Sequence, residues 1–264
     1  EEARPYLKQA AELGLLEAQC MYIIDPLVIS EESGKDFSSE VKKYVNLIRN
    51  AANQGDPDGQ VCLAMLYEEG FGVSEDMKTA VKWYQKAADQ GNADAQSKLG
   101  ECYYLGKGVA ENDAKAVKWF QKSADQGHDY AQYNLGECYY SGKGVAENDA
   151  KAVKWFQKSA DQGNADAQCR LGNCYLCGNG VLKNEQKAAS FYQKAANQEH
   201  AKAQYWLGKC YQLEWGVKED FQKAIEWYKK SIDNGYDKLD IYESISKTFL
   251  FIIWERADNG TNLY

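Results

Sequence analysis

The chain contains the same 36-residue block twice in succession, at residues 92–127 and 128–163, and the two copies differ at only six positions. Related blocks extend the period on both sides, at 56–91, 164–199 and 200–235. A fixed period of this length is typical of a solenoid, in which each repeat buries its apolar face against its neighbours. The period therefore predicts a stack of small, similar units.

Outside the five blocks the period weakens. Residues 15–55 form a degenerate repeat with an insertion, and residues 1–14 resemble only the second half of a block. Because the chain starts in mid-repeat, we expect further repeats upstream. Residues 236–264 leave the period, and we expect a capping helix followed by a tail. The predicted organisation is a truncated repeat at 1–14, a degenerate repeat at 15–55, five full repeats at 56–235 and a cap at 236–264.

Each block predicts two helices. In the first copy Ala95, Leu99 and Cys102 fall on one face of a first helix, and Ala116 and Phe120 fall on one face of a second. An aspartate or asparagine stands where each second helix should begin, suited to accept hydrogen bonds from first-turn amides. These residues are Asp76, Asn112, Asn148, Asn184 and Asp220. Strand signals are sparse, so the fold class is all-α.

Glycines punctuate the helices where left-handed backbone is needed. Gly106 and Gly108 follow the first helix, and Gly127 follows the second. Glu199 stands at the position of Gly127 in its own block, so that backbone should be strained or rearranged. Glu214 likewise replaces the first loop glycine of the last block.

The pattern A-x-x-x-L-G-x-x-Y-x-x-G-x-G-V, followed by an Asx and K-A-x-x-W-[FY]-x-K-[AS]-A, resembles the Sel1-like repeat (SLR), a relative of the tetratricopeptide repeat. The resemblance covers residues 15–235 approximately. It implies a right-handed α/α superhelical solenoid of helix-turn-helix repeats, whose first helices line a concave groove. It also implies a non-catalytic scaffold or adaptor that acts through protein–protein interaction.

Composition limits the partners and the compartment. The net charge of −8 and the pI of about 5.0 make nucleic acid a poor partner, and the chain has no apolar run long enough to span a membrane. Four of the eight cysteines share one position in successive blocks, where equivalent atoms should lie roughly 8–10 Å apart. That separation is too large for a disulfide. Reduced thiols favour a cytoplasmic location over a secreted or periplasmic one.

Motifs for catalysis or metal binding are weak. Cys174 and Cys177 form a C-x-x-C, but the repeat pattern already accounts for Cys174 as a buried residue. Ser39 and Ser244 each begin an S-x-x-K, the nucleophile motif of penicillin-binding enzymes, yet the S-D-N and K-T-G elements are absent. We therefore expect no enzyme, no cofactor and no metal site. A penicillin-binding type of enzyme is the less favoured alternative.

The six differences between the two copies have a pattern. They fall at 92/128, 93/129, 94/130, 97/133, 98/134 and 105/141, while the second helix is unchanged. Those within the first helix lie on the face opposite the buried stripe, which the resemblance identifies as the groove wall. Drift of unconstrained positions would also alter the exposed face of the second helix. The pattern therefore favours diversification of a binding groove over drift, with gene conversion as a third explanation.

The groove positions supply the candidate binding site. They are Asp94, Ser97, Glu101, Tyr104, Tyr130, Tyr133, Glu137, Tyr140, Asn173, Tyr205 and Lys209. Tyrosines with acidic neighbours predict a protein or peptide partner that carries basic residues. Alternatively, individual tyrosines pack between neighbouring first helices. The alternative function is a bacterial immunity or host-interaction protein that clasps a toxin or host factor.

The C-terminal apolar run is a possible second surface. It includes Phe249, Phe251, Ile252 and Trp254. A terminal cap needs one apolar face only, so this helix either covers the last repeat or docks a partner or a second copy of the chain.

Overall fold

The computed structural model describes residues 10–12, 15, 18–21, 39–237, 241–242 and 246, and within these residues it contains helices and no strand. The helices with full bounds are α4 Ser39–Asn53, α5 Pro57–Glu69, α6 Met77–Asp89, α7 Ala93–Leu105, α8 Asp113–Asp125, α9 Asp129–Ser141, α10 Asp149–Asp161, α11 Ala165–Cys177, α12 Glu185–Ala196, α13 Ala201–Leu213 and α14 Phe221–Asp233. The predicted all-α fold is confirmed.

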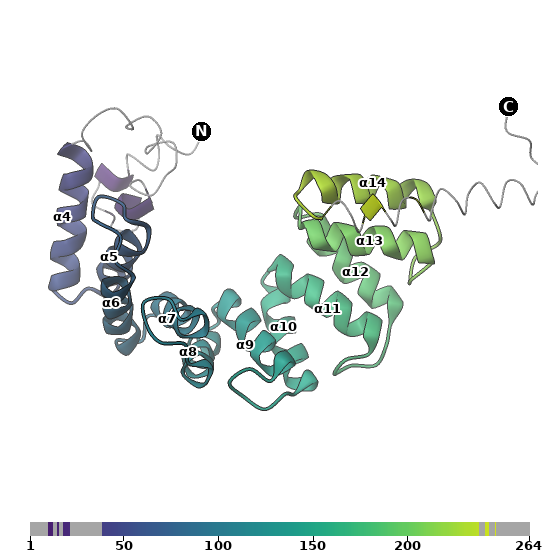
Figure 1. The fold of residues 1–264 in the computed structure, drawn as a ribbon, viewed down its shortest axis with the longest axis horizontal. Coiled ribbons are helices and arrows are strands. Elements are labelled where there is room, and N and C mark those ends of the chain that lie inside the picture. The colour runs from purple at the N-terminus through teal and green to yellow at the C-terminus, as the bar shows by residue number, and fades with distance from the viewer. Residues whose placement is uncertain are drawn as a thin grey trace, which may run out of the picture. The chain divides into compact units, whose positions relative to one another are not determined.

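Each repeat is a pair of antiparallel helices joined by a short loop, such as α7 and α8 in Figure 1. The chain forms two compact units, with unit 1 at residues 1–138 and 142–146 and unit 2 at residues 139–141 and 147–264. In unit 1, successive helices from α4 to α8 pack against one another. In unit 2, successive helices from α10 to α14 do the same.

Side chains cap both helices of every full repeat. Asn112 Oδ1, for example, accepts a hydrogen bond from the Lys115 amide at the start of α8. The predicted caps of the second helices are all present, at Asp76, Asn112, Asn148, Asn184 and Asp220. The first helices have caps too, at Asp56, Asn92, His128, Asn164 and His200. Each cap of this kind stabilises its helix by about 1 kcal/mol.

The two loop glycines, Gly106 and Gly108, have different structural roles. Gly106, at φ 68°, ends α7 with its N–H bonded to the Cys102 carbonyl. Gly108 has a φ of 69°, and a Cβ there would lie 2.4 Å from the Met77 carbonyl oxygen at the start of the preceding second helix. The loop therefore lies directly on the neighbouring repeat. Glu199 and Glu214 keep the left-handed backbone of the glycines they replace, with φ of 62° and 57°.

The core is repeated along the stack. Leu99 is fully buried, and Gly100 beside it lets the ring of Phe120 approach so closely that a Cβ would lie 2.6 Å from it. Gly208 has the same relation to Tyr228. The Leu-Gly and Trp-[Phe/Tyr] elements of the sequence pattern are thus two sides of one contact, since a larger residue at the glycine would collide with the ring.

A chain of buried glutamines links successive repeats. Gln96 donates to the Ala88 carbonyl at 3.1 Å and accepts from Gln126 Nε2 at 2.8 Å. Corresponding bonds to the preceding second helix are made by Gln60, Gln132, Gln168 and Gln204. Because a buried polar group without a partner is costly, these bonds fix the spacing between repeats.

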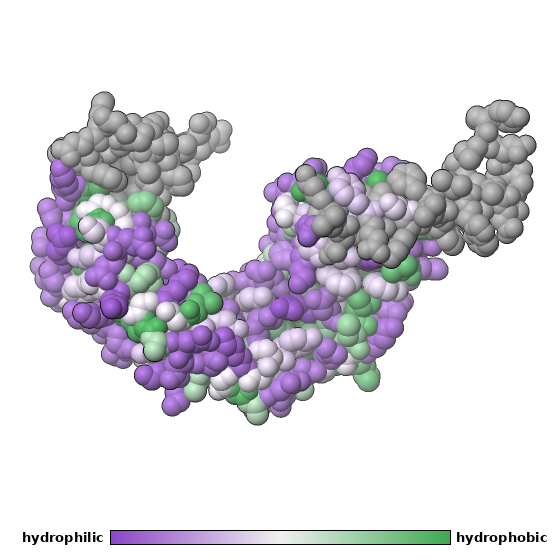
Figure 2. Space-filling view, viewed as in Figure 1, coloured by the Kyte–Doolittle hydropathy of each residue, from purple (hydrophilic) through white to green (hydrophobic). Residues whose placement is uncertain are grey.

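None of the eight cysteines, all of which the structure describes, forms a disulfide. Cys177 is exposed and the other seven are buried. Among the described residues, no helix is long and apolar enough to cross a membrane. Where Figure 2 shows the described surface, it is mostly hydrophilic, with hydrophobic residues in small patches.

Several predictions made from the sequence lie outside the described residues. The second surface at Phe249, Phe251, Ile252 and Trp254 is among them, as is Ser244. The side chain of Ser39 is also outside them.

Candidate binding site

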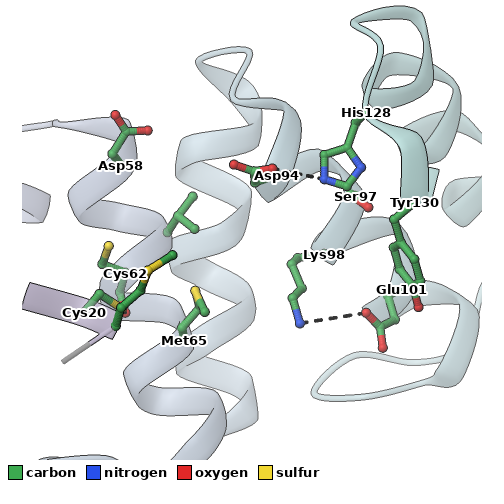
Figure 3. A pocket seen from close by; sticks show the side chains of 12 residues that line it. Cys20, Asp58, Cys62, Met65, Asp94, Ser97, Lys98, Glu101, His128 and Tyr130 are labelled. Carbon is green, nitrogen blue, oxygen red and sulfur yellow. Dashed lines mark hydrogen bonds and ion pairs between the residues drawn. The ribbon is translucent and has the colours of Figure 1, made fainter. Parts of the chain in front are cut away.

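A pocket of about 660 Å³ opens on the first helices of unit 1. We call it the first-helix pocket. Its walls come from α5, from α7, from the beginning of α9 and from a short helical segment at 18–21. The lining residues are Cys20, Met21, Asp58, Val61, Cys62, Met65, Asp94, Ser97, Lys98, Glu101, His128 and Tyr130 (Figure 3). Four consecutive repeats, counting the degenerate repeat 15–55, therefore contribute to one concave site.

Apolar and sulfur-containing side chains form one part of the pocket. Met21 is exposed, while Val61 and Met65 of α5 are half-buried. Cys20 and Cys62 are buried, with Cys20 Sγ 3.8 Å from the Cys62 carbonyl oxygen. Methionine side chains are flexible and polarisable, so they adapt to differently shaped apolar ligands.

Charged side chains form the other part. Lys98 Nζ lies 3.7 Å from a carboxylate oxygen of Glu68 and 4.0 Å from one of Glu101. Asp58 accepts a hydrogen bond of 2.9 Å from the Asn92 amide group. Asp58, Asp94 and Glu101 thus place three carboxylates at the pocket against one lysine, which favours a cationic ligand group.

His128 joins two repeats at the pocket. Its Nδ1 accepts the Ala131 amide hydrogen at 3.2 Å, and its Nε2 lies 3.0 Å from Asp94 Oδ1 (Figure 3). The hydrogen bond from the His128 ring lowers the pKa of the Asp94 carboxyl below its ordinary value. Asp94 is therefore ionised at neutral pH.

Four of the predicted groove residues come together at this pocket, namely Asp94, Ser97, Glu101 and Tyr130. Tyr130 is 40% exposed and points into the pocket. Ser97 differs from the expectation of an exposed groove wall, because its side chain is buried. Ser97 nevertheless lines the pocket.

The other predicted residues of unit 1 do not line the pocket. Tyr104 is half-buried, with its ring 6.3 Å from that of Phe120 and Lys143 Nζ 3.9 Å from its centre. Tyr133 and Glu137 are half-buried on α9. Tyr104 thus contacts the second helix of its own repeat and the loop that follows α9.

The predicted residues of unit 2 are also half-buried and engaged in internal contacts. Tyr140 Oη accepts a hydrogen bond from Asn179, and Asn173 Oδ1 accepts one of 2.6 Å from the Tyr192 hydroxyl. Tyr205 stacks on Tyr236 at 4.9 Å. Lys209 Nζ lies 5.7 Å from the centre of the Tyr205 ring. In unit 2 these positions therefore contribute to internal contacts.

Cys20, Met21 and Cys62 line the pocket but were not predicted from the sequence. Alignment of Glu17-Ala18-Gln19 with Asp94-Ala95-Gln96 places Cys20 at the position of Ser97. That alignment could have identified Cys20 and Met21, and Cys62 aligns with the differing position 98/134 of the doubled block.

Within the described residues, no group of three or more histidine, cysteine, aspartate or glutamate side chains could hold a metal ion. In the C-x-x-C, Cys174 is buried and Cys177 is exposed.

The sequence matches the family model of the Sel1 repeat over residues 1–15, 57–92, 93–128, 129–164, 165–200 and 201–236. No curated protein sequence is significantly similar to the chain.

Several solved structures are similar to the chain. One is a protective antigen present in uropathogenic Escherichia coli strains that displays an SLR fold, with a TM-score of 0.72 and 33% identity. The match covers 88% of this chain and 49% of the antigen, so this chain spans about half the antigen's length. Another is a Sel1 repeat protein from Oxalobacter formigenes, with a TM-score of 0.69 and 35% identity over 74% of this chain and 82% of that one.

An immunity protein from Pseudomonas aeruginosa shares only the fold, with a TM-score of 0.52 and 22% identity over 83% of this chain and 82% of that one. Sel1 repeat proteins are generally protein-interaction scaffolds. The matches to successive repeats and the similarity to solved Sel1 repeat structures show that the chain belongs to the Sel1 repeat family.

Proposed function

We propose that the protein is a non-catalytic scaffold that binds a protein or peptide segment at the first-helix pocket of unit 1. The observation that carries the proposal is the composition of the pocket, where apolar side chains adjoin three carboxylates. A complementary segment has one large apolar side chain next to lysine or arginine.

The apolar anchor would lie against Val61, Met65 and Tyr130. Tyrosine gives a large contact area at little cost in side-chain entropy, and the two copies of the doubled block differ here, with Asp94 in one and Tyr130 in the other. The basic side chain would lie toward Asp58, Asp94 and Glu101. Carboxylates at such a rim raise the association rate and select against acidic partners.

The proposal can be tested by selecting peptides from a random display library against the wild-type protein. The affinity of a selected peptide is then measured by fluorescence polarisation. We expect selected sequences to combine lysine or arginine with a large apolar residue. Loss of a central anchor in Met65→Ala or Tyr130→Ala should weaken binding about 10- to 30-fold.

Asp58→Asn/Glu101→Gln should weaken binding more at low salt than at high salt, because screening already reduces the attraction at high salt. Lys107→Ala in the exposed loop after α7 is the control and should leave the affinity unchanged. The absence of basic peptides among those selected, or equal affinity in the wild type and all four variants, would show that the pocket does not bind such segments.

A further inference from the structure

A second concave surface lies on the second helices of unit 1. It has a volume of about 590 Å³, and α8 supplies most of its lining. We call it the second-helix pocket. Its lining residues are Gln85, Tyr103, Lys115, Val117, Lys118, Trp119, Gln121 and Lys122. None of them lines the first-helix pocket, so the two sites are separate.

The charge of this pocket is opposite to that of the whole chain. Lys115, Lys118 and Lys122 are all exposed, and the described residues that line the pocket include no aspartate or glutamate. The chain as a whole carries a net charge of −8. A local concentration of lysine on an acidic protein attracts acidic groups selectively to that place.

Two of the lysines lie over aromatic rings. Lys122 Nζ is 3.9 Å from the centre of the Trp119 ring, and Lys115 Nζ is 5.0 Å from that of Tyr103. Both rings are half-buried. The cation–π contacts hold the ammonium groups beside apolar surface. The pocket therefore offers cationic donors and aromatic contact area together.

The neighbouring carboxylates are already engaged. Gln85 Nε2 donates to Asp89 Oδ1 at 2.8 Å, and Gln121 Nε2 donates to Asp125 Oδ1 at the same distance. Each glutamine lies one helical turn before the aspartate that accepts its hydrogen bond. These bonds therefore hold each carboxylate against its own helix.

The same helix sequence and the same lysine–aromatic contacts recur in unit 2. The thirteen residues of α10 are identical to those of α8. There Lys158 Nζ lies 4.0 Å from the Trp155 ring centre, and Lys151 Nζ lies 5.1 Å from that of Tyr139. The doubled block thus preserves exposed lysines that the core does not require, while its first helices have diverged.

We propose that α8 and α10 each bind an acidic protein segment that carries a large apolar side chain. The glutamate or aspartate groups of the segment pair with the lysines, and its apolar side chain lies against the tryptophan. This activity is independent of the first-helix pocket, which takes a segment of opposite charge. The protein would then hold a basic partner on its first helices and an acidic partner on its second helices.

Isothermal titration calorimetry with a synthetic peptide of alternating glutamate and leucine tests the proposal. We expect the wild-type protein to bind two equivalents and the peptide with glutamine in place of glutamate to bind at least tenfold more weakly. Lys118→Glu/Lys122→Glu should remove one equivalent, and Lys154→Glu/Lys158→Glu should remove the other.

The matched control is Lys107→Glu/Lys218→Glu, which changes the net charge equally at two exposed loop positions and should retain both equivalents. Helix content from circular dichroism checks that each variant is folded. Two equivalents retained in Lys118→Glu/Lys122→Glu would overturn the proposal. So would equal loss in the control, or displacement of the peptide by a single-stranded DNA of the same charge, since either result indicates general attraction of polyanions.

Discussion

His128 Nε2 lies 3.0 Å from Asp94 Oδ1, across the boundary between two repeats, while Nδ1 of the same ring caps α9 by accepting the Ala131 amide hydrogen. Nδ1 can accept that hydrogen only when it is unprotonated. His200 and Asp166 repeat the arrangement in unit 2, with Ala203 as the capped residue. One imidazole therefore caps the N-terminus of a helix and contacts an aspartate of the preceding repeat.

Replacement of these histidines by asparagine should preserve both contacts. Asn92 already caps α7 through Oδ1 and donates to Asp58 at 2.9 Å. We expect His128→Asn to retain nearly the full stability. His128→Ala, which loses the cap, should be destabilised by about 1 kcal/mol, or about 2–4 °C in Tm. Thermal unfolding followed by circular dichroism distinguishes these outcomes. If both variants unfold at the same lower temperature, the imidazole itself is required.

The acidic partner of the pair makes the stability depend on pH. The hydrogen bond from His200 lowers the pKa of Asp166 below its ordinary value of 3.8. A carboxyl whose pKa is lower in the folded state contributes stability above the unfolded pKa, and the contribution is lost as pH falls through the folded pKa. Asp166→Asn should therefore reduce Tm at pH 7 and have little effect near pH 2. The carboxylate is largely exposed, so the difference at pH 7 should be small. An equal effect at both pH values would contradict this account.

The sequence period was sufficient to predict the helix pairs and the caps of the second helices, because both depend on local chemistry. The accessibility of the groove residues was not predictable in the same way. Ser97 lies on the expected side of α7, yet it is only 3% exposed, since neighbouring helices cover it. Tyr205 stacks on Tyr236, a residue beyond the last full repeat. A helical projection shows where a side chain points, but contacts from other repeats decide whether a ligand can reach it.

The buried glutamines are a signal that the sequence did contain. Gln96 has an equivalent glutamine in every full block, after alanine in four of them and after Gly59 in the first, at a position that reads as polar and therefore as exposed. In the structure its side chain is 4% exposed and spans the interface to the preceding second helix. A polar residue repeated at one position in every block is better interpreted as part of an interface network, since unpaired burial would be costly.

Glu199 should be the simplest site for stabilisation. Its φ of 62° lies in the left-handed region, where a non-glycine residue costs about 1–2 kcal/mol. Glycine occupies the equivalent positions at Gly91, Gly127 and Gly163. Because glycine also adds entropy to the unfolded chain, Glu199→Gly should stabilise by somewhat less, about 0.5–1 kcal/mol. Chemical denaturation measures the change. The converse variant, Gly127→Glu, should lose stability, and a gain there would contradict the explanation.

The thiols should differ sharply in reactivity. Burial raises the pKa of Cys102, Cys138 and Cys210 to about 12, and the thiolate is the reactive form. Cys177, in contrast, is exposed at the end of α11. At pH 8 we expect Ellman's reagent to modify one thiol rapidly in the native protein and all eight after denaturation in guanidinium. Cys177→Ser should abolish the rapid phase, whereas Cys102→Ser should retain it. Rapid modification of several thiols in the native protein would show that the repeats open more readily than their packing indicates.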